Sequence, residues 1–206
     1  ATSADNTVNI SGQNLQVSDV VFVLLFLQKF TNFNNRSIFA GYIQTLLNGN
    51  SSLTDSKGQY IFEHAFEYLK SIHVNPNLNE CERLYNEIIK DIFHSTAQNA
   101  QMILDVCQKV GAIGVKLGFT SNYFGLVYVG ISKEFLTLCT NCGLQLNKLQ
   151  YGNSKLFENI NKEDSPVNFL IGSQKFTEGW SSWRVSLMGL MRFGQQEGSQ
   201  IIQMFG

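Results

Sequence analysis

Residues 124–143 have the sequence FGLVYVGISKEFLTLCTNCG, and this segment carries the clearest sign of the fold class. It starts with an apolar, β-branched run over 124–129 that ends at Gly130, which is typical of a buried strand. Ser132 then provides an N-cap for a helix that we expect to end at Gly143, a residue type that often follows helix C-termini. A buried strand joined directly to a helix is the unit from which α/β sheets are built.

Other apolar runs in the second half of the chain extend this pattern. Residues 102–106 and 114–117 are predicted strands around a glycine-rich turn, and residues 167–171 form another strand-like run that ends at Gly172. We also expect a short helix at 156–160 and a strand at 185–191. Strands that alternate with helices, with glycines closing the apolar runs, predict a parallel α/β sheet flanked by helices.

The first half of the chain is predicted to be helical. Four amphipathic or apolar stretches, at 15–30, 38–47, 61–69 and 81–92, have helical spacing, and Ser18 and Asp19 are candidate N-caps for the first. We therefore divide the chain into a mainly helical part or insertion at 14–95 and an α/β part at 100–206. No linker separates them into two domains.

Composition limits the classes of function. Apolar residues make up 44% of the 206 residues, which is enough for a packed core, and the formal net charge is −1. This charge argues against binding nucleic acid or anionic lipid over the whole surface, although a local groove remains compatible with it. Four cysteines are too few for a disulfide scaffold, so we expect a reducing, cytoplasmic location.

Neither the apolar runs nor the first residues of the sequence have the features of a targeting or membrane-spanning segment. The longest apolar run is 20–27, whereas a bilayer crossing needs about 20 residues, so we expect no membrane insertion. Residues 1–12 lack the order of charges and apolar residues that a signal peptide has. The chain stops inside an apolar, helix-like pattern at 201–206, and we expect it to be a piece of a longer protein.

Candidate chemistry concentrates where two predicted strands end. One end is 130–132, and the other is 172–184, GSQKFTEGWSSWR, which contains hydroxyl groups, both tryptophans, Lys175 and Arg184. Hydroxyls, backbone N–H groups and a cation beyond a strand end are suited to binding phosphate. The structural alternative is that the tryptophans seal the sheet edge while the polar residues form a solvated turn. Arg184 could equally pair with Glu178 or stack on Trp183.

Two segments resemble a known family. Residues 171–186, IGSQKFTEGWSSWRVS, and 197–206, EGSQIIQMFG, resemble motifs V and VI of superfamily 2 DEAD/DEAH-type helicases related to the Res subunit of type III restriction enzymes. Weaker similarity continues upstream at 114–117, 123–130 and 164–166. The resemblance implies that the chain is part of the second RecA-like lobe, whose partner lobe completes an ATP cleft, and that hydrolysis drives movement along DNA.

The resemblance also implies roles for individual residues. Ser173 would contact the nucleic-acid backbone, while Gly179 and Ser181 would face the nucleotide, although Ser181 departs from the Asp or Asn often found there. Gln203 and Gly206 match the start of motif VI, and the chain stops before that motif's arginines. Lys175 and Arg184 are the candidate phosphate contacts that the residues themselves suggest.

The chain lacks the elements needed to hydrolyse ATP alone. It contains no G-x-x-x-x-G-K-[ST] loop and no Walker B type Asp-Glu pair beside an apolar strand. ATP and Mg²⁺ would thus belong to the full-length protein, with no catalytic or metal-binding residue in this piece. The implied partners are DNA, the first RecA-like lobe and, in a restriction complex, a methyltransferase or specificity subunit; any nuclease residues would lie elsewhere.

Two other interpretations are compatible with parts of the sequence. Cys139 and Cys142 form a C-x-x-C pair, but a zinc site needs four ligands and the remaining cysteines form no second pair, so burial as small apolar residues is favoured. The alternative function is a non-catalytic α/β interaction module whose tryptophan-rich loop docks a protein partner.

Overall fold

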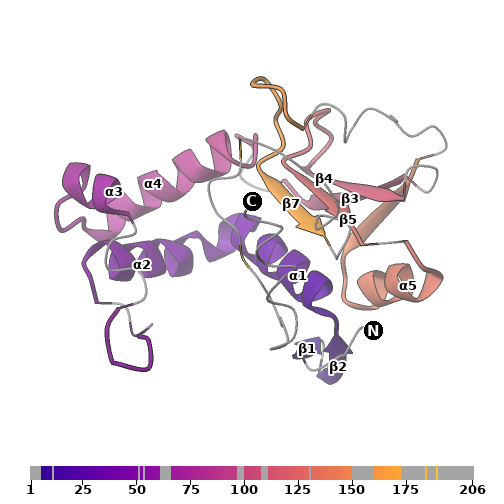
Figure 1. Ribbon diagram of the computed structural model, residues 1–206, viewed down its shortest axis with the longest axis horizontal. Helices are drawn as coiled ribbons and strands as arrows, with labels where there is room; N and C mark the ends of the chain where they lie inside the picture. Colours follow the sequence, from indigo (N-terminus) through magenta and orange to yellow (C-terminus); the bar gives the residue numbers. More distant parts are fainter. Residues whose placement is uncertain are drawn as a thin grey trace. The chain divides into compact units, whose positions relative to one another are not determined.

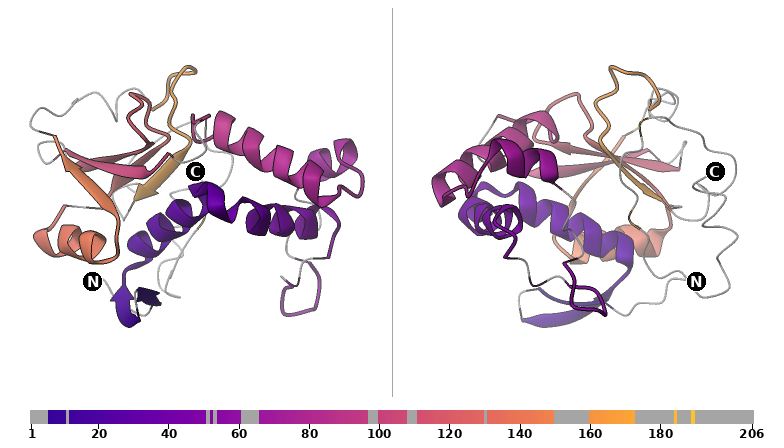
Figure 2. Two further views of the ribbon diagram at one scale, coloured as in Figure 1. Left: turned by 180° about the vertical axis from the view of Figure 1, so that it is seen from behind. Right: turned by 60° about the vertical axis from the view of Figure 1, so that its left-hand side comes forward.

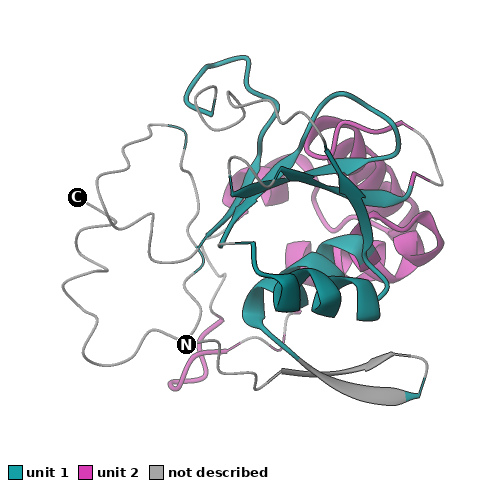
Figure 3. Ribbon diagram, turned by 90° about the vertical axis from the view of Figure 1, so that its right-hand side faces the viewer, with its two compact units in different colours: residues 1–28, 101–206 teal, residues 29–100 magenta. Residues whose placement is uncertain are grey.

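The computed structural model describes residues 6–10, 12–50, 52, 54–60, 66–96, 100–107, 111–129, 131–149, 160–172, 184 and 189. The chain divides into two compact units, one formed by Ala1–Gln28 with Gln101–Gly206 and the other by Lys29–Ala100 (Figure 3). The predicted strand at 185–191 and the predicted helix at 156–160 lie almost entirely outside the described residues.

The first unit contains a five-stranded sheet in the order β6-β3-β4-β5-β7 (Figure 1). Its strands are β3 (Met102–Cys107), β4 (Ala112–Leu117), β5 (Gly125–Tyr128), β6 (Gln145–Lys148) and β7 (Phe169–Gly172). The four strands predicted at 102–106, 114–117, 124–129 and 167–171 are confirmed within about two residues at each end, the usual uncertainty of such boundaries. Strand β6 was not expected, since QLNK contains a single apolar residue.

The sheet is mixed, so the prediction of a parallel sheet is wrong for one strand. β3 pairs with β6 and β5 pairs with β7 in parallel, whereas β4 is antiparallel to both of its neighbours, β3 and β5. Among these five described strands, β4 alone runs against the others. The physical reason is the length of the link at 108–111, because a parallel crossover requires roughly a dozen residues or more.

The part of α1 (Asp19–Thr31) that belongs to the first unit, up to Gln28, lies on the same side of the sheet as α5 (Lys133–Asn141) (Figures 1 and 2). The predicted helix after Ser132 is confirmed, and the Ser132 side chain accepts a hydrogen bond from Phe135 N at 3.1 Å. Every residue of β3 is buried, which is why its sequence shows no alternation of apolar and polar residues. The sheet core includes Leu104, Val106, Ile113, Val115 and Val127.

A hairpin of β1 (Asn6–Ile10) and β2 (Gln13–Val17) precedes α1 and was missed from the sequence. Its register places Val8 opposite Leu15, and the chain reverses at Gly12, whose φ of +83° is readily available only to glycine. Because β2 occupies 13–17, the first helix begins at Asp19, four residues later than the predicted range starts.

The second unit is helical in its described part. It contains the 3₁₀ helix η1 (Phe33–Asn35), α2 (Arg36–Leu47), α3 (Glu67–Ile72) and α4 (Leu78–Asp91). Helices α2 and α4 confirm the predictions at 38–47 and 81–92 and pack side by side (Figure 2). A capping box fixes the start of α4, with the Asn77 and Glu80 side chains bonding each other's backbone N–H. An aromatic cluster forms the core, with Phe30 contacting Phe39, Tyr85 and Phe93.

Gly114 in β4 leaves room for the ring of Tyr123. A Cβ atom added to Gly114 would lie 2.5 Å from two ring carbons of Tyr123, closer than atoms can approach. The ring cannot retreat without moving its hydroxyl, which donates a hydrogen bond to Asp105. The glycine is therefore required here for close approach rather than for an unusual backbone angle.

Gly114→Ala should lower the free energy of unfolding by about 1–3 kcal/mol, the usual cost of overpacking a well-packed site. Urea denaturation at neutral pH measures this change. Gly41→Ala in α2 is the matched control, because its Cβ would meet nothing within 4 Å, and it should gain about 0.5–1 kcal/mol from helix propensity. Equal stability of Gly114→Ala and the wild type would contradict the prediction.

Candidate functional site

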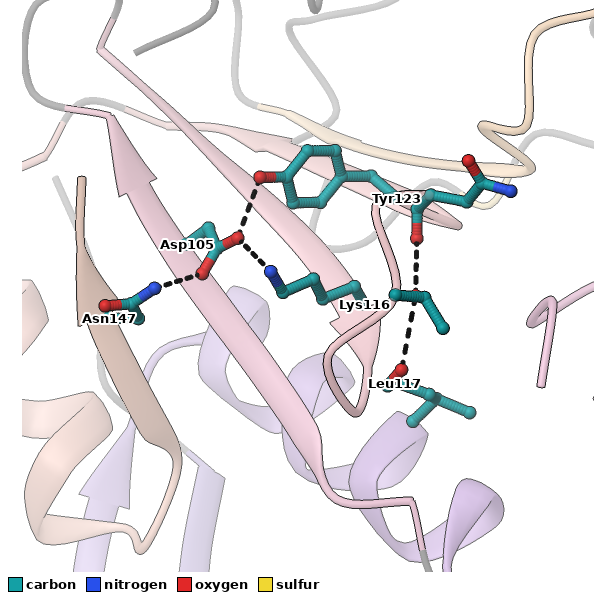
Figure 4. Close-up of polar contacts among 7 residues, drawn as sticks. Asp105, Lys116, Leu117, Tyr123 and Asn147 are labelled. Carbon is teal, nitrogen blue, oxygen red and sulfur yellow. Dashed lines mark hydrogen bonds and ion pairs between the residues drawn. The ribbon is translucent and has the colours of Figure 1, made fainter. Parts of the chain in front are cut away.

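A buried carboxylate is the centre of the main polar cluster in the described part of the sheet (Figure 4). Asp105 in β3 is only 1% exposed. Its Oδ2 atom lies 2.6 Å from Lys116 Nζ and accepts a hydrogen bond from Tyr123 Oη at 2.7 Å. Its Oδ1 atom accepts from Asn147 Nδ2 at 2.9 Å. Both carboxylate oxygens thus have partners. We call these four residues the Asp105 network.

Strand register explains why the members of the Asp105 network meet. Asp105 pairs directly with Asn147 across the parallel β3–β6 ladder and with Gly114 across the antiparallel β3–β4 ladder. Lys116 lies two residues beyond Gly114, so it is on the same face and diagonal to Asp105. Tyr123 comes from the segment between β4 and β5, and its ring occupies the space beside Gly114. Three strands and one connection thus converge on one carboxylate.

The charges in the Asp105 network are balanced. Burial raises the pKa of Asp105, but hydrogen bonds from Lys116, Tyr123 and Asn147 and the lysine charge outweigh burial, so its pKa is below the ordinary value. Burial and the bond to Asp105 raise the pKa of Tyr123, which keeps the phenol protonated as a donor. The Lys116 amine also lies 5.6 Å from the centre of the Tyr123 ring. This arrangement holds strands together and suits a structural role better than proton transfer to a substrate.

The two strand ends singled out from the sequence are neighbours in the sheet. β5 and β7 are parallel, and Tyr128 pairs with Gly172, so the segments that follow them leave the sheet at the same edge. Six of the predicted site residues lie outside the described residues, and the structure therefore neither brings them together nor separates them: Ser173, Lys175, Gly179, Ser181, Gln203 and Gly206.

Arg184 is the one predicted site residue that the structure describes. Its Nη1 atom donates to the carbonyl oxygen of Ile160 at 2.6 Å, and its Nη2 atom donates to that of Ser165 at 3.1 Å. Both acceptors belong to the segment that leads into β7. The other partners considered for this guanidinium, Glu178 and Trp183, lie outside the described residues.

The C-x-x-C pair is buried, as expected. Cys139 lies in α5 and Cys142 is the residue that follows this helix, and both are buried free thiols. Burial raises the pKa of both, that of Cys139 to about 12, with a smaller contribution from the neighbouring Cys142. Thiols with raised pKa values are poor nucleophiles and poor metal ligands. Within the described ranges, no group of three or more His, Cys, Asp or Glu residues is placed to hold a metal ion.

Comparison with known proteins adds no family assignment: no protein-family model, curated protein or solved structure matches the chain. Among the described helices, none combines the length and the apolar character that crossing a bilayer demands. The functional assignment therefore depends on the sequence motifs and on the geometry described above.

The stability of the chain should depend on the charge of Asp105. Because the pKa of this carboxyl is lower in the folded chain than its ordinary value of 3.8, its stabilising contribution is complete above that value and is lost as the pH falls through the depressed folded value. We expect the wild type to lose more unfolding free energy between about pH 5 and about pH 2 than Asp105→Asn does. Urea denaturation over this pH series is the measurement.

Asp164→Asn, at an exposed carboxylate of the same unit, is the matched control for this series. Its acid dependence should follow that of the wild type. If Asp105→Asn did so as well, the charge of Asp105 would have no part in stabilising the folded chain.

Proposed function

We propose that this chain is part of the second RecA-like lobe of an ATP-dependent DNA translocase, of the helicase class related to the Res subunit of type III restriction enzymes. The observation that carries the proposal is the resemblance of two segments, 171–186, IGSQKFTEGWSSWRVS, and 197–206, EGSQIIQMFG, to motifs V and VI of this class. The lobe would supply these motifs to a cleft that the first lobe completes.

The parallel pair of β5 and β7 supports the proposal. Ligands of open α/β sheets bind beyond the carboxyl ends of the strands. Strands β3, β5, β6 and β7 point the same way, and the segments after β5 and β7 leave adjacent positions at that edge. Helix α5, capped by Ser132, begins close to the end of β5, and a helix N-terminus favours negatively charged groups. The reversed strand β4 is the feature that an all-parallel lobe does not predict.

Each motif residue has a distinct role in the proposal. Ser173 and Lys175 contact DNA phosphates, and Gly179 and Ser181 face the nucleotide. Gln203 and Gly206 begin motif VI, whose arginines belong to the longer protein together with the ATP- and Mg²⁺-binding loop of the first lobe. An arginine that meets the transferred phosphoryl group contributes about 10³–10⁵ in rate. The sequence also holds no phosphate-binding loop with its lysine, so under the proposal we expect this lobe by itself not to hydrolyse ATP. The four free thiols fit a reducing cytoplasm.

Lys175→Ala should weaken DNA binding to the same extent for different sequences, because phosphate contacts carry no base information. The measurement is a titration of the wild type and of Lys175→Ala with single-stranded and duplex DNA over a salt series. The slope of log affinity against log salt should be smaller in magnitude by about 1 for Lys175→Ala than for the wild type. Lys57→Ala, at an exposed lysine of the second unit, is the control and should leave the slope unchanged. A wild type that binds neither DNA at low salt would instead favour the non-catalytic interaction module.

Gly179→Val tests the nucleotide role in the longer protein that contains both lobes. A β-branched side chain at this glycine would crowd the backbone that faces the nucleotide, and a Val residue restricts the backbone angles open to Gly. We expect DNA-stimulated ATP hydrolysis to be abolished while DNA binding persists. Turnover at the wild-type rate would remove Gly179 from the nucleotide site.

A further inference from the structure

The contacts of Arg184 suggest a role other than the phosphate contact considered from the sequence. We propose that Arg184 is a positioning residue, whose guanidinium fixes the far end of the segment that follows β7 to the turn that precedes β7. The importance of that segment for nucleotide and DNA binding rests on the proposed function. The attachment itself depends only on the described contacts.

The hydrogen bonds from Arg184 to Ile160 and Ser165 use the planar fork of its guanidinium. Nη1 reaches the Ile160 carbonyl at 2.6 Å and Nη2 reaches the Ser165 carbonyl at 3.1 Å. A guanidinium presents several donors in fixed directions and can bridge two acceptors, whereas an ammonium group is a compact point charge. Pro166 restricts the backbone of Ser165 to extended conformations, which fixes the direction of the second carbonyl.

The segment to which Arg184 is bonded, residues 160–169, is itself fixed to the sheet. Ile160 is buried and packs in a cluster with Leu126 of β5, Val167 and Leu170. Two backbone N–H groups, those of Asn168 and Phe169, donate to Phe124 O at 2.8 and 3.0 Å. Residues 160–169 are therefore fixed relative to β5. The guanidinium of Arg184, which is bonded to residues 160 and 165, is fixed relative to the same strand.

The attachment has a consequence for the chain between residues 172 and 184. Gly172 ends β7, and Arg184 is bonded to the segment that leads into β7, so both described residues, 172 and 184, are fixed relative to the same strand. Fixing both ends of a segment removes conformations that a freely ending segment would sample. The two terminal nitrogens of the guanidinium both donate to backbone carbonyls, and in the proposed function the phosphate contact is assigned to Lys175. Arg184 is exposed overall, so its contribution is orientation rather than burial.

The test uses the two tryptophans of the chain, Trp180 and Trp183, both of which lie between residues 172 and 184. Acrylamide quenching of their fluorescence reports on this segment in the native chain. Arg184→Met removes both hydrogen bonds and should raise the quenching constant about twofold, because the segment loses one of its two fixed ends. Arg184→Lys keeps the charge but not the fork, and its quenching constant should lie between those of the wild type and Arg184→Met.

Tyr123→Phe is the matched control. It removes one hydrogen bond of the same unit, that to Asp105, and should lower stability without changing tryptophan quenching. The salt dependence of DNA binding gives a second readout, in which Arg184→Met should keep the wild-type slope while Lys175→Ala lowers it by about 1.

Two results would overturn the positioning role. One is a quenching constant that is the same in Arg184→Met as in the wild type. The other is a slope of log DNA affinity against log salt that is lower by about 1 in Arg184→Met and restored in Arg184→Lys, as a phosphate contact requires. If the wild type binds no DNA at all, the proposed function fails, while the quenching series still decides whether Arg184 holds the segment.

Discussion

A carboxylate can keep its charge inside an apolar sheet only where hydrogen-bond donors surround it, since an unpaired buried charge costs several kcal/mol. Asp105 meets this condition with donors from β4, from β6 and from the segment before β5. A slip of one residue in either ladder would turn Asp105 away from these donors and toward the opposite, apolar face. The Asp105 network thus couples the register of β3 to both of its neighbours, whereas the direction of β4 follows from the short link at 108–111.

The sequence identified most of the strands because each consists of consecutive apolar, often β-branched residues closed by glycine. It did not identify β6, since Gln145, Asn147 and Lys148 give a polar pattern that only the ladder with β3 explains. The alternation of strands and helices wrongly predicts a parallel β4, whereas the short link at 108–111 permits only the antiparallel direction. The hairpin at 6–17 was not predicted, because its Ser11-Gly12 turn signal lies in a polar segment without a clear strand pattern.

The residues of the Asp105 network and of the candidate site differ in the kind of signal that each one leaves in the sequence. Asp105 and Lys116 lie in apolar runs that predicted strands, and a single charge within each run was the available sign of a buried pair. A motif residue such as Gly179 is recognised by its residue type within a pattern of neighbours, which sequence comparison can detect. The acceptors of Arg184 are backbone carbonyls, which every residue has, and no sequence pattern could have distinguished Ile160 and Ser165 from their neighbours.

Among the strands that the structure describes, the two outermost, β6 and β7, differ in chemistry. β6 presents mostly polar residues, including Lys148, and a lysine on an outer strand hinders pairing with another chain because its charge would have to be desolvated. β7 instead consists of Phe169, Leu170 and Ile171 before its final glycine, and these three are only partly covered. Among the described strands, pairing with a further strand is therefore less favourable beside β6 than beside β7.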